Sequence, residues 1–299
     1  MKVAIFVALS FLVTTSATGF SAAGHEAVCE IAYLELTTEA KEAVDKLIDT
    51  ETDDRFKTFR DACVWPDTIS GGPTEDRGED HYINVPRTWH YIRYEKCVIN
   101  DTCLFSAIRQ DESVLRGSST DEDKWKSLKY LGHWFGDIHQ PLHVSFKDDR
   151  GGNQVLLENG IGCRKKLHSV WDQCIPEDLM QAMDLDPDDT SQREDFGQML
   201  HSEITDDQRI EWTSEMRLDK IAGESFWQAR QPEVQYCVRD GNKCKYTKTD
   251  LEHISHGEEE NTRTIELTGA YEDQFHDVIR ARIQAAGVRL GAMLNDIYP

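Results

Sequence analysis

Histidine and aspartate stand four residues apart in two short stretches of this chain. His133 precedes Asp137, and His168 precedes Asp172. Residues at this interval lie on one face of a helix, so each pair could chelate one ion. Imidazole and carboxylate ligands without cysteine suit a zinc ion that keeps a position open for water or substrate, whereas closed structural sites usually contain thiolates. The predicted chemistry is metal-assisted hydrolysis.

Four more potential ligands occur in the first half of the chain: His25, Asp67, His81 and His143. Alone, a histidine with apolar neighbours is more often a hydrogen-bonded core residue than a metal ligand, so the metal interpretation depends on the whole set. The remaining histidines and the aromatic residues beside the ligands are interpreted as structural: His90, His139, His201, His253, His256, His276, Trp134, Phe135 and Trp171.

The chain begins with a segment typical of export signals. Met1 and Lys2 precede an apolar run over residues 3–13, and the small residues Ala17 and Gly19 follow it. We predict that residues 1–19 are removed and that residues 20–299 form a secreted or periplasmic protein. No second apolar stretch approaches the ~20 residues that a membrane helix requires, so we expect no membrane segment.

The remaining chain has no linker-like stretch and no internal repeat, so a single domain is expected, acting as a monomer. The formal net charge of the full chain is −22, and loss of Lys2 with the export signal makes it −23. This acidity argues against a basic surface that binds duplex nucleic acid, because backbone phosphates require lysine and arginine. Bound divalent ions could still make one site locally positive, so a substrate held at a single phosphate remains compatible with the charge.

All eight cysteines lie after the predicted export signal, and an even number in an exported chain favours disulfides. Two pairs are close enough in sequence to close small loops: Cys97 with Cys103, and Cys237 with Cys244. Two further pairings are weaker hypotheses: Cys163 with Cys174, and Cys29 with Cys63.

Helical periodicity dominates the chain, so the predicted fold class is all-α. Amphipathic helices are expected over residues 26–36, 39–48, 125–138, 207–229 and 271–294, with Thr37 or Thr38 as a cap and a stop at Pro141. Alternation typical of a strand is limited to short pieces such as residues 153–157. Residues 184–195 and 247–263 are polar and predicted to be loops.

Several motifs, in the same order, resemble those of the S1/P1 nucleases, a family of zinc-dependent single-strand nucleases and 3′-nucleotidases. The opening Phe20-Ser-Ala-Ala-Gly24-His25 is similar to the family's Trp-Gly-x-x-Gly-His. The match continues through Trp65-Pro-Asp67, His81-Tyr-Ile-Asn84, Gly132-His133 to Leu142-His143, Gly151-Gly152-Asn153, Leu167-His168 to Asp172, and a closing helix around Ala285 to Leu290. The resemblance spans nearly all of residues 20–299.

This resemblance implies a single multi-helix domain of the phospholipase C/P1 nuclease type with a three-zinc cleft. It assigns one zinc to Asp67, His81, His133 and Asp137, and a second to His143, His168 and Asp172. The third would be held by His25, by Asp137 as a bridge, and by the amino group and carbonyl of Phe20. A tryptophan is usual at the position of Phe20, but its ligand atoms are backbone atoms, so the chelate is expected to survive once residues 1–19 are removed.

The resemblance also implies the reaction. The expected activity is hydrolysis of single-stranded DNA and RNA to 5′-phosphate products, together with 3′-nucleotidase activity, by a hydroxide that bridges two zinc ions. Asp67, Asp137 and Asn153 would be catalytic, with Asn153 also donating to phosphate. Tyr82 would stack on a base and Asn84 would contact the base edge. His81 is preferred to His90 as the ligand after Asp67, because its His-Tyr-Ile-Asn context and spacing match the family.

One position departs from the family pattern. An arginine or lysine usually follows the first aspartate ligand by three residues, and here that position is Ser70. Two interpretations stay open on the sequence: Arg77 takes the place of this basic residue at the substrate phosphate, or the reaction is slower without a basic residue there. Two alternatives remain open on the sequence: a three-zinc phospholipase C, against which Asp172 and Gly151-Gly152-Asn153 argue, and a catalytically weak exported binding protein that keeps the zinc site.

Overall fold

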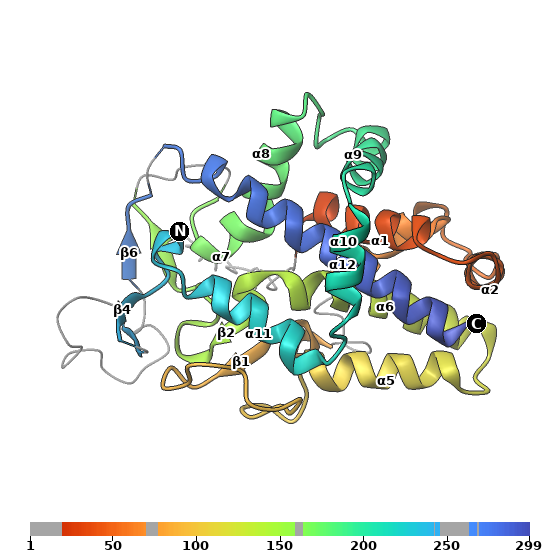
Figure 1. The fold of residues 1–299 in the computed structure, drawn as a ribbon, viewed down its shortest axis with the longest axis horizontal. Helices are drawn as coiled ribbons and strands as arrows, with labels where there is room; N and C mark the ends of the chain where they lie inside the picture. Colours follow the sequence, from red (N-terminus) through yellow and green to blue (C-terminus); the bar gives the residue numbers. More distant parts are fainter. Residues whose placement is uncertain (1–19, 70–76, 159–163, 242, 246–262, 268) are drawn as a thin grey trace, which may run out of the picture.

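Helices make up most of the computed structural model, which describes the chain except residues 1–19, 70–76, 159–163, 242, 246–262 and 268 (Figure 1). The α-helices are α1 (Ala22–Leu34), α2 (Thr38–Ile48), α3 (Phe59–Ala62), α4 (Trp65–Ile69), α5 (Leu104–Arg116), α6 (Asp121–His139), α7 (Leu167–Ser169), α8 (Ile175–Ala182), α9 (Thr190–Ser202), α10 (Asp206–Thr213), α11 (Leu218–Ala229) and α12 (His276–Ile297). The predicted all-α class is confirmed.

Single-turn helical segments connect the longer helices: η1 (Asp54–Phe56), η2 (Gly78–His81), η3 (Pro141–His143), η4 (Lys147–Asp149), η5 (Val170–Cys174), η6 (Pro232–Val234) and η7 (Asp273–Phe275). All are 3₁₀ turns except η5, which is a π-helix. Such π segments are rare and occur mostly at functional sites. This one carries Asp172, one of the predicted ligands.

The core forms where α1 and α6 pack against the long C-terminal helix α12. In Figure 1, α12 runs across the front of the molecule, with α6 behind it and α5 along the lower edge. Close packing depends on glycine: a Cβ on Gly287 of α12 would lie 2.5 Å from the side chain of Ile31. A Cβ on Gly197 of α9 would likewise meet Glu30 at 2.8 Å. Both helices therefore rest directly on α1.

Three two-stranded pairs complete the fold: β1 (Ile83–Val85) with β2 (Val144–Phe146), β3 (Val155–Leu157) with β6 (Arg263–Ile265), and β4 (Val238–Asp240) with β5 (Lys243–Lys245). The first pair matters for the site. It is parallel, with Ile83 opposite Val144, so the residues just before the two strands also lie together. They include His81, two residues before β1, and His143, directly before β2, and the His143 Nδ1 donates to the His81 carbonyl at 2.5 Å.

The predicted helices over 26–36, 39–48 and 125–138 correspond to α1, α2 and α6 with shifts of a few residues. The Thr37 cap is confirmed, because its hydroxyl accepts from the Ala40 amide. The C-terminal helix begins later than predicted, since residues 273–275 form a 3₁₀ turn before α12. The predicted strand is shorter and begins at Val155.

The single helix predicted over 207–229 is wrong, because α10 ends at Thr213 and α11 begins at Leu218. The hydroxyls of Thr213 and Ser214 donate back to helical carbonyls at 2.7 Å, a local bond that competes with helix continuation. Glu95 then accepts from the Leu218 amide at 2.9 Å and caps the new helix.

The predicted loop over 184–195 is also partly wrong, because α9 starts at Thr190. Asp189 caps it by accepting from the Ser191 amide at 2.9 Å. The polar residues of the first turn face solvent, and only Phe196, Gly197 and Leu200 are buried. Of the other predicted loop, residues 247–262 lie outside the described part, and Arg263 opens β6.

Three of the predicted disulfides are present: Cys29–Cys63, Cys97–Cys103 and Cys237–Cys244. Cys174 is disulfide-bonded as well, whereas its predicted partner Cys163 lies outside the described residues. Within the described ranges, no helix has the length and apolar character needed to cross a membrane.

Candidate metal centre

One face of α6 carries the centre of the site. His133 and Asp137 project from this face one turn apart, and both are fully buried. The His25 side chain reaches them from α1, with its ring stacked on that of His133 at a centroid distance of 3.8 Å. Glycine makes this approach possible, since a Cβ on Gly136 would lie 2.4 Å from the His25 Nδ1. The His25 Nε2 lies 3.5 Å from the Asp137 Oδ1.

A second group adjoins the other oxygen of Asp137. The His81 Nδ1 lies 3.1 Å from the Asp137 Oδ2 and 3.2 Å from the His133 Nε2. The Asp67 Oδ1, from α4, lies 3.4 Å from the same His133 nitrogen. The two carboxylate oxygens of Asp137 thus face different neighbours, as expected of a bridging ligand.

The third group comes from two segments that follow α6 in the chain. The His143 Nε2 lies 3.5 Å from the Asp172 Oδ1, and the His168 Nε2 lies 3.4 Å from the Asp172 Oδ2. His168 and Asp172 are four apart, as predicted, although α7 and the π-helix η5 replace one continuous α-helix. All three side chains are at most 5% exposed.

The donor sets fit zinc. Tetrahedral coordination at 2.0–2.1 Å places neighbouring donor atoms about 3.3 Å apart. Five of the donor separations within the groups, 3.1–3.5 Å, match this edge length, and the His81 Nδ1 and Asp67 Oδ1 lie 3.9 Å apart. In addition, neither nitrogen of the fully buried His25 hydrogen-bonds to any group in the described part of the chain. Buried polar atoms are rarely left unbonded, so a missing cation is a direct explanation.

Backbone carbonyls orient the ligating rings. The Nδ1 of His133 donates to the Cys63 carbonyl at 2.8 Å, and the Nδ1 of His168 donates to the Gly151 carbonyl at 2.7 Å. Metal-binding histidines usually donate their second nitrogen in this way, which fixes the ring and leaves Nε2 for the ion. Gly151 adopts φ 64°, and a Cβ there would lie 2.7 Å from a backbone oxygen, which accounts for glycine at this position.

Charge in the site is balanced by protons when no cation is bound. Burial opposes protonation of His133, but the carboxylates of Asp137 and Asp67 outweigh it and raise its pKa to about 9. His143 behaves in the same way beside Asp137 and Asp172, with a pKa raised to about 10. Burial instead lowers the pKa of His25 to about 4. Divalent cations would replace the protons, so metal binding is expected to release them.

The N-terminal residue of the predicted mature chain lies at the site. The Phe20 side chain is fully buried, with its ring 6.3 Å from that of His25. The adjacent Ser21 amide donates to the Asp172 carbonyl at 2.6 Å. Phe20 is therefore held between the first and third groups, where the predicted backbone chelate would form. Its role as a ligand stays a prediction.

The predicted substrate residues lie around the groups. Tyr82 and Asn84 lie one and three residues after His81, are partly exposed, and line a small hollow with residues 97–100, 102 and 103. Asn153 is partly exposed, and its amide donates to the Arg150 carbonyl at 3.0 Å. The roles of Tyr82, Asn84 and Asn153 in substrate binding stay predictions.

Arg77 has a different environment from the one expected. Its guanidinium pairs with Asp80 at 2.6 Å and with Asp111 at 2.9 Å, and it lies over the rings of Tyr130 and Trp134. The side chain is 17% exposed. These contacts are those of a residue that holds η2 against α6, and a phosphate contact by Arg77 stays a prediction. Ser70 lies outside the described residues.

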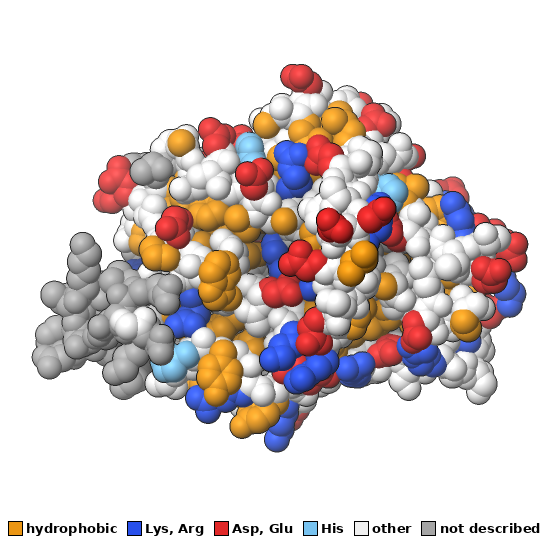
Figure 2. Space-filling view, viewed as in Figure 1, with side chains coloured by type: hydrophobic (Ala, Val, Ile, Leu, Met, Phe, Trp, Pro, Cys, Tyr) orange, Lys and Arg blue, Asp and Glu red, His pale blue; other side chains and the backbone are white. Residues whose placement is uncertain are grey.

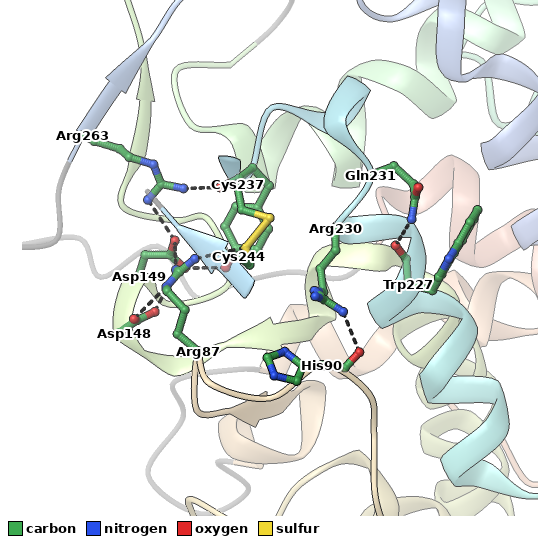
Figure 3. The surroundings of a disulfide bond; sticks show 11 residues. Arg87, His90, Asp148, Asp149, Trp227, Arg230, Gln231, Cys237, Cys244 and Arg263 are labelled. Carbon is green, nitrogen blue, oxygen red and sulfur yellow. Dashed lines mark hydrogen bonds and ion pairs between the residues drawn. A yellow bond between two sulfur atoms is a disulfide. The ribbon is translucent and has the colours of Figure 1, made fainter. Parts of the chain in front are cut away.

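Sequence reasoning overlooked Gln140, which is fully buried between the ligand segments. Its amide nitrogen donates to the Asp172 Oδ1, and its amide oxygen accepts from the Leu142 backbone N–H. The only sequence signal was a polar residue directly before Pro141 in a stretch dense in ligands. His90, by contrast, lies away from the groups, and its carbonyl accepts from Arg230 (Figure 3).

The helical body and the adjoining buried His/Asp groups are those of a metal-dependent hydrolase. The chain matches the family described as S1/P1 Nuclease over residues 20–299 and belongs to that family. The matched region begins at the predicted export junction.

Named relatives agree with this assignment. The chain is 26% identical over 289 residues to "Endonuclease 5" of Arabidopsis thaliana, covering 92% of this chain and 89% of the relative. It is 25% identical over 292 residues to "Nuclease S1" of Aspergillus oryzae, covering 93% and 91% respectively. It is also 27% identical over 225 residues to "Nuclease P1" of Penicillium citrinum, covering 73% and 76%. The protein is therefore a hydrolase of the nuclease class.

Proposed function

We propose that this protein is an exported, three-zinc phosphodiesterase that cleaves single-stranded DNA and RNA to 5′-phosphate products and removes the phosphate of 3′-nucleotides. The main support for the proposal is that the two carboxylate oxygens of Asp137 face different groups. One oxygen lies 3.5 Å from His25 and the other lies 3.1 Å from His81. A buried carboxylate in this position would hold two ions close together, as two-metal hydrolysis requires.

Residues of the chain would hold the metal ions in two parts of the site. Asp67 and Asp137 would fix the paired ions, while His143, His168 and Asp172 would hold the third. Zinc, when bound, lowers the pKa of water and stabilises charge on phosphate oxygens. Burial of the ligands excludes bulk water, so these electrostatic contributions are large.

The base of the substrate would be bound by Tyr82 and Asn84. Both are partly exposed and lie one and three residues after the proposed ligand His81. Stacking on an aromatic ring needs an unpaired base and contributes ~1–3 kcal/mol with little sequence selectivity. A preference for single strands over duplexes follows. Asn153 would donate to the phosphate after exchanging its bond to the Arg150 carbonyl.

The deciding experiment is metal analysis of the protein comprising residues 20–299, with hydrolysis of single-stranded DNA and 3′-AMP measured with and without a chelator. The proposal expects three zinc ions per chain and loss of both activities on chelation. A metal-free protein that retains hydrolysis would refute it, and cleavage of phosphatidylcholine alone would favour a phospholipase.

A matched pair of variants tests the ligand assignment. His81→Ala should remove zinc and abolish 3′-AMP hydrolysis, whereas His90→Ala should leave both unchanged. The two histidines have similar sequence contexts, so the comparison separates the proposed ligand from a nearby histidine outside the groups. The reverse result would exchange their roles and overturn the proposed set.

A further inference from the structure

An aromatic and cationic surface lies on the loop between β1 and α5, next to the metal centre. The loop leaves the site at Tyr82 and returns to it, because the Leu104 amide donates to the Tyr82 carbonyl at 3.3 Å. Both ends are thus fixed beside the ligand His81. In Figure 1 this loop projects at the lower edge of the molecule, where Figure 2 shows hydrophobic and basic side chains next to one another.

Four side chains of the loop form a connected set, which we call the aromatic loop surface: Tyr91, Arg93 and Tyr94 are exposed, and Trp89 is partly buried against the core. Tyr91 is 61% exposed and Tyr94 is 59% exposed, unusual for large aromatic residues. The Arg93 guanidinium lies 4.9 Å from the Trp89 ring centre and 5.6 Å from that of Tyr91. Trp89 and Tyr94 meet edge to face at 6.5 Å.

The loop is held in place by four separate contacts. Arg87 pairs with Asp148 and Asp149 at 2.8 and 2.7 Å, as drawn in Figure 3. The carbonyl of His90 accepts from Arg230 of α11. Glu95 accepts from α11, and the Cys97–Cys103 disulfide closes the far end. The exposed rings are therefore presented on a fixed framework, so binding to them would not require ordering of the loop.

The charge of the loop differs from that of the whole chain. Residues 86–103 contain three cations and two acids, in a chain of net charge −22. Arg93 has no acidic partner within 4 Å among the described residues, whereas Glu95 is paired with Arg109 at 2.8 Å. The available charge on the aromatic loop surface is therefore positive.

We infer that the aromatic loop surface binds the single-stranded part of a nucleic-acid substrate that extends beyond the metal centre. Exposed aromatic rings beside an arginine that has no acidic partner among the described residues are suited to stacked bases and backbone phosphates. A folded duplex would not offer its base faces to these rings. The inference deepens the proposed function, because it adds a second contact region for the same substrate.

Kinetics on substrates of different length test the inference. Tyr91→Ala/Tyr94→Ala should raise KM for a 30-nucleotide strand about fivefold or more, since one lost base stack is worth ~1–3 kcal/mol and about 1.4 kcal/mol is tenfold. The same variant should hydrolyse 3′-AMP as the wild type does, because the proposed base contacts of a mononucleotide are Tyr82 and Asn84 and do not include Tyr91 or Tyr94. Tyr91→Phe/Tyr94→Phe should restore the wild-type KM, since phenylalanine keeps the stacking face.

The salt dependence of strand binding tests the contribution of the Arg93 charge. Arg93→Ala should lower the slope of log Kd against log salt concentration by about 0.7 for a single strand. Arg55→Ala is the matched control, because Arg55 is also exposed and lies over an aromatic ring at 5.0 Å but belongs to η1 and pairs with Asp53. The control should leave the slope unchanged.

The outcomes separate this inference from the proposed function. Binding is measured in a His133→Ala background, so it does not depend on cleavage. Equal KM and Kd for long strands in the tyrosine variant and the wild type would overturn the inference, even if hydrolysis is normal. A wild-type protein that cuts no phosphoester, but binds strands through Tyr91 and Tyr94, would overturn the function and leave the inference standing.

Discussion

Removing the Gln140 amide should weaken the third metal group without removing any ligand. Gln140 donates to the Asp172 Oδ1 and accepts from the Leu142 amide, so it ties the carboxylate of one ligand segment to the backbone before His143. Gln140→Met keeps the length and burial of the side chain but deletes both bonds. Outer partners of this kind change metal affinity by about 10–100-fold, or about 1.4–2.7 kcal/mol.

The assay is zinc retention during titration with a chelator of known affinity. One of the three proposed ions should be lost from Gln140→Met at a free-zinc concentration about 10–100-fold higher than in the wild type, with the other two unchanged. The metal-free variant should also be less stable by about 1–3 kcal/mol, because the Leu142 N–H is left buried without a partner.

A second buried glutamine provides the control. Gln284 of α12 is 3% exposed and donates to the Leu200 carbonyl at 2.7 Å. Gln284→Met should lose a comparable amount of stability with no change in zinc affinity. Zinc retention in Gln140→Met equal to that of this control would refute the positioning role.

Three further predictions concern the ligands, the packing and pH. His133→Ala should reduce hydrolysis of single-stranded DNA and 3′-AMP by at least about 100-fold, because losing even a residue that only hydrogen-bonds to a metal ligand reduces activity by up to about 100-fold. Retention of either activity would exclude His133 as a ligand. Gly136→Ala should displace His25, 2.4 Å from the added Cβ, and lower zinc content, whereas Gly223→Ala has open space and should stabilise its helix by up to about 1 kcal/mol in urea unfolding. Partial burial raises the pKa of Glu51, but hydrogen bonds from Lys129, the Asp53 backbone and Trp125 outweigh it and lower the pKa to about 2. The contribution of Glu51 to folding stability is therefore complete above about pH 4.5 and disappears as the pH falls towards 2. Glu51→Gln should therefore cost about 1–2 kcal/mol at pH 7 and progressively less on acidification, measured by urea unfolding at several pH values.

Local chemistry in the sequence was sufficient to predict the helical class and the two His/Asp pairs proposed as metal ligands. The four-residue spacing of His133 and Asp137 requires only one helical turn, and a helix depends on local hydrogen bonds and periodicity. The Thr37 cap is equally local, because the hydroxyl and the amide it binds are three residues apart. Motif order, compared with a known family, supplied the remaining ligands and the choice of His81 over His90.

The tertiary structure decided how the proposed ligands are brought together and what surrounds them. His25 and His133 are 108 residues apart in the chain, and their stacking depends on α1 packing against α6 over Gly136. The pairing of Arg77 with Asp111 and the start of α11 at Leu218 depend on contacts between distant segments, the second through Glu95. Side-chain patterns describe one segment at a time, so partners supplied by other segments become visible only in the folded chain.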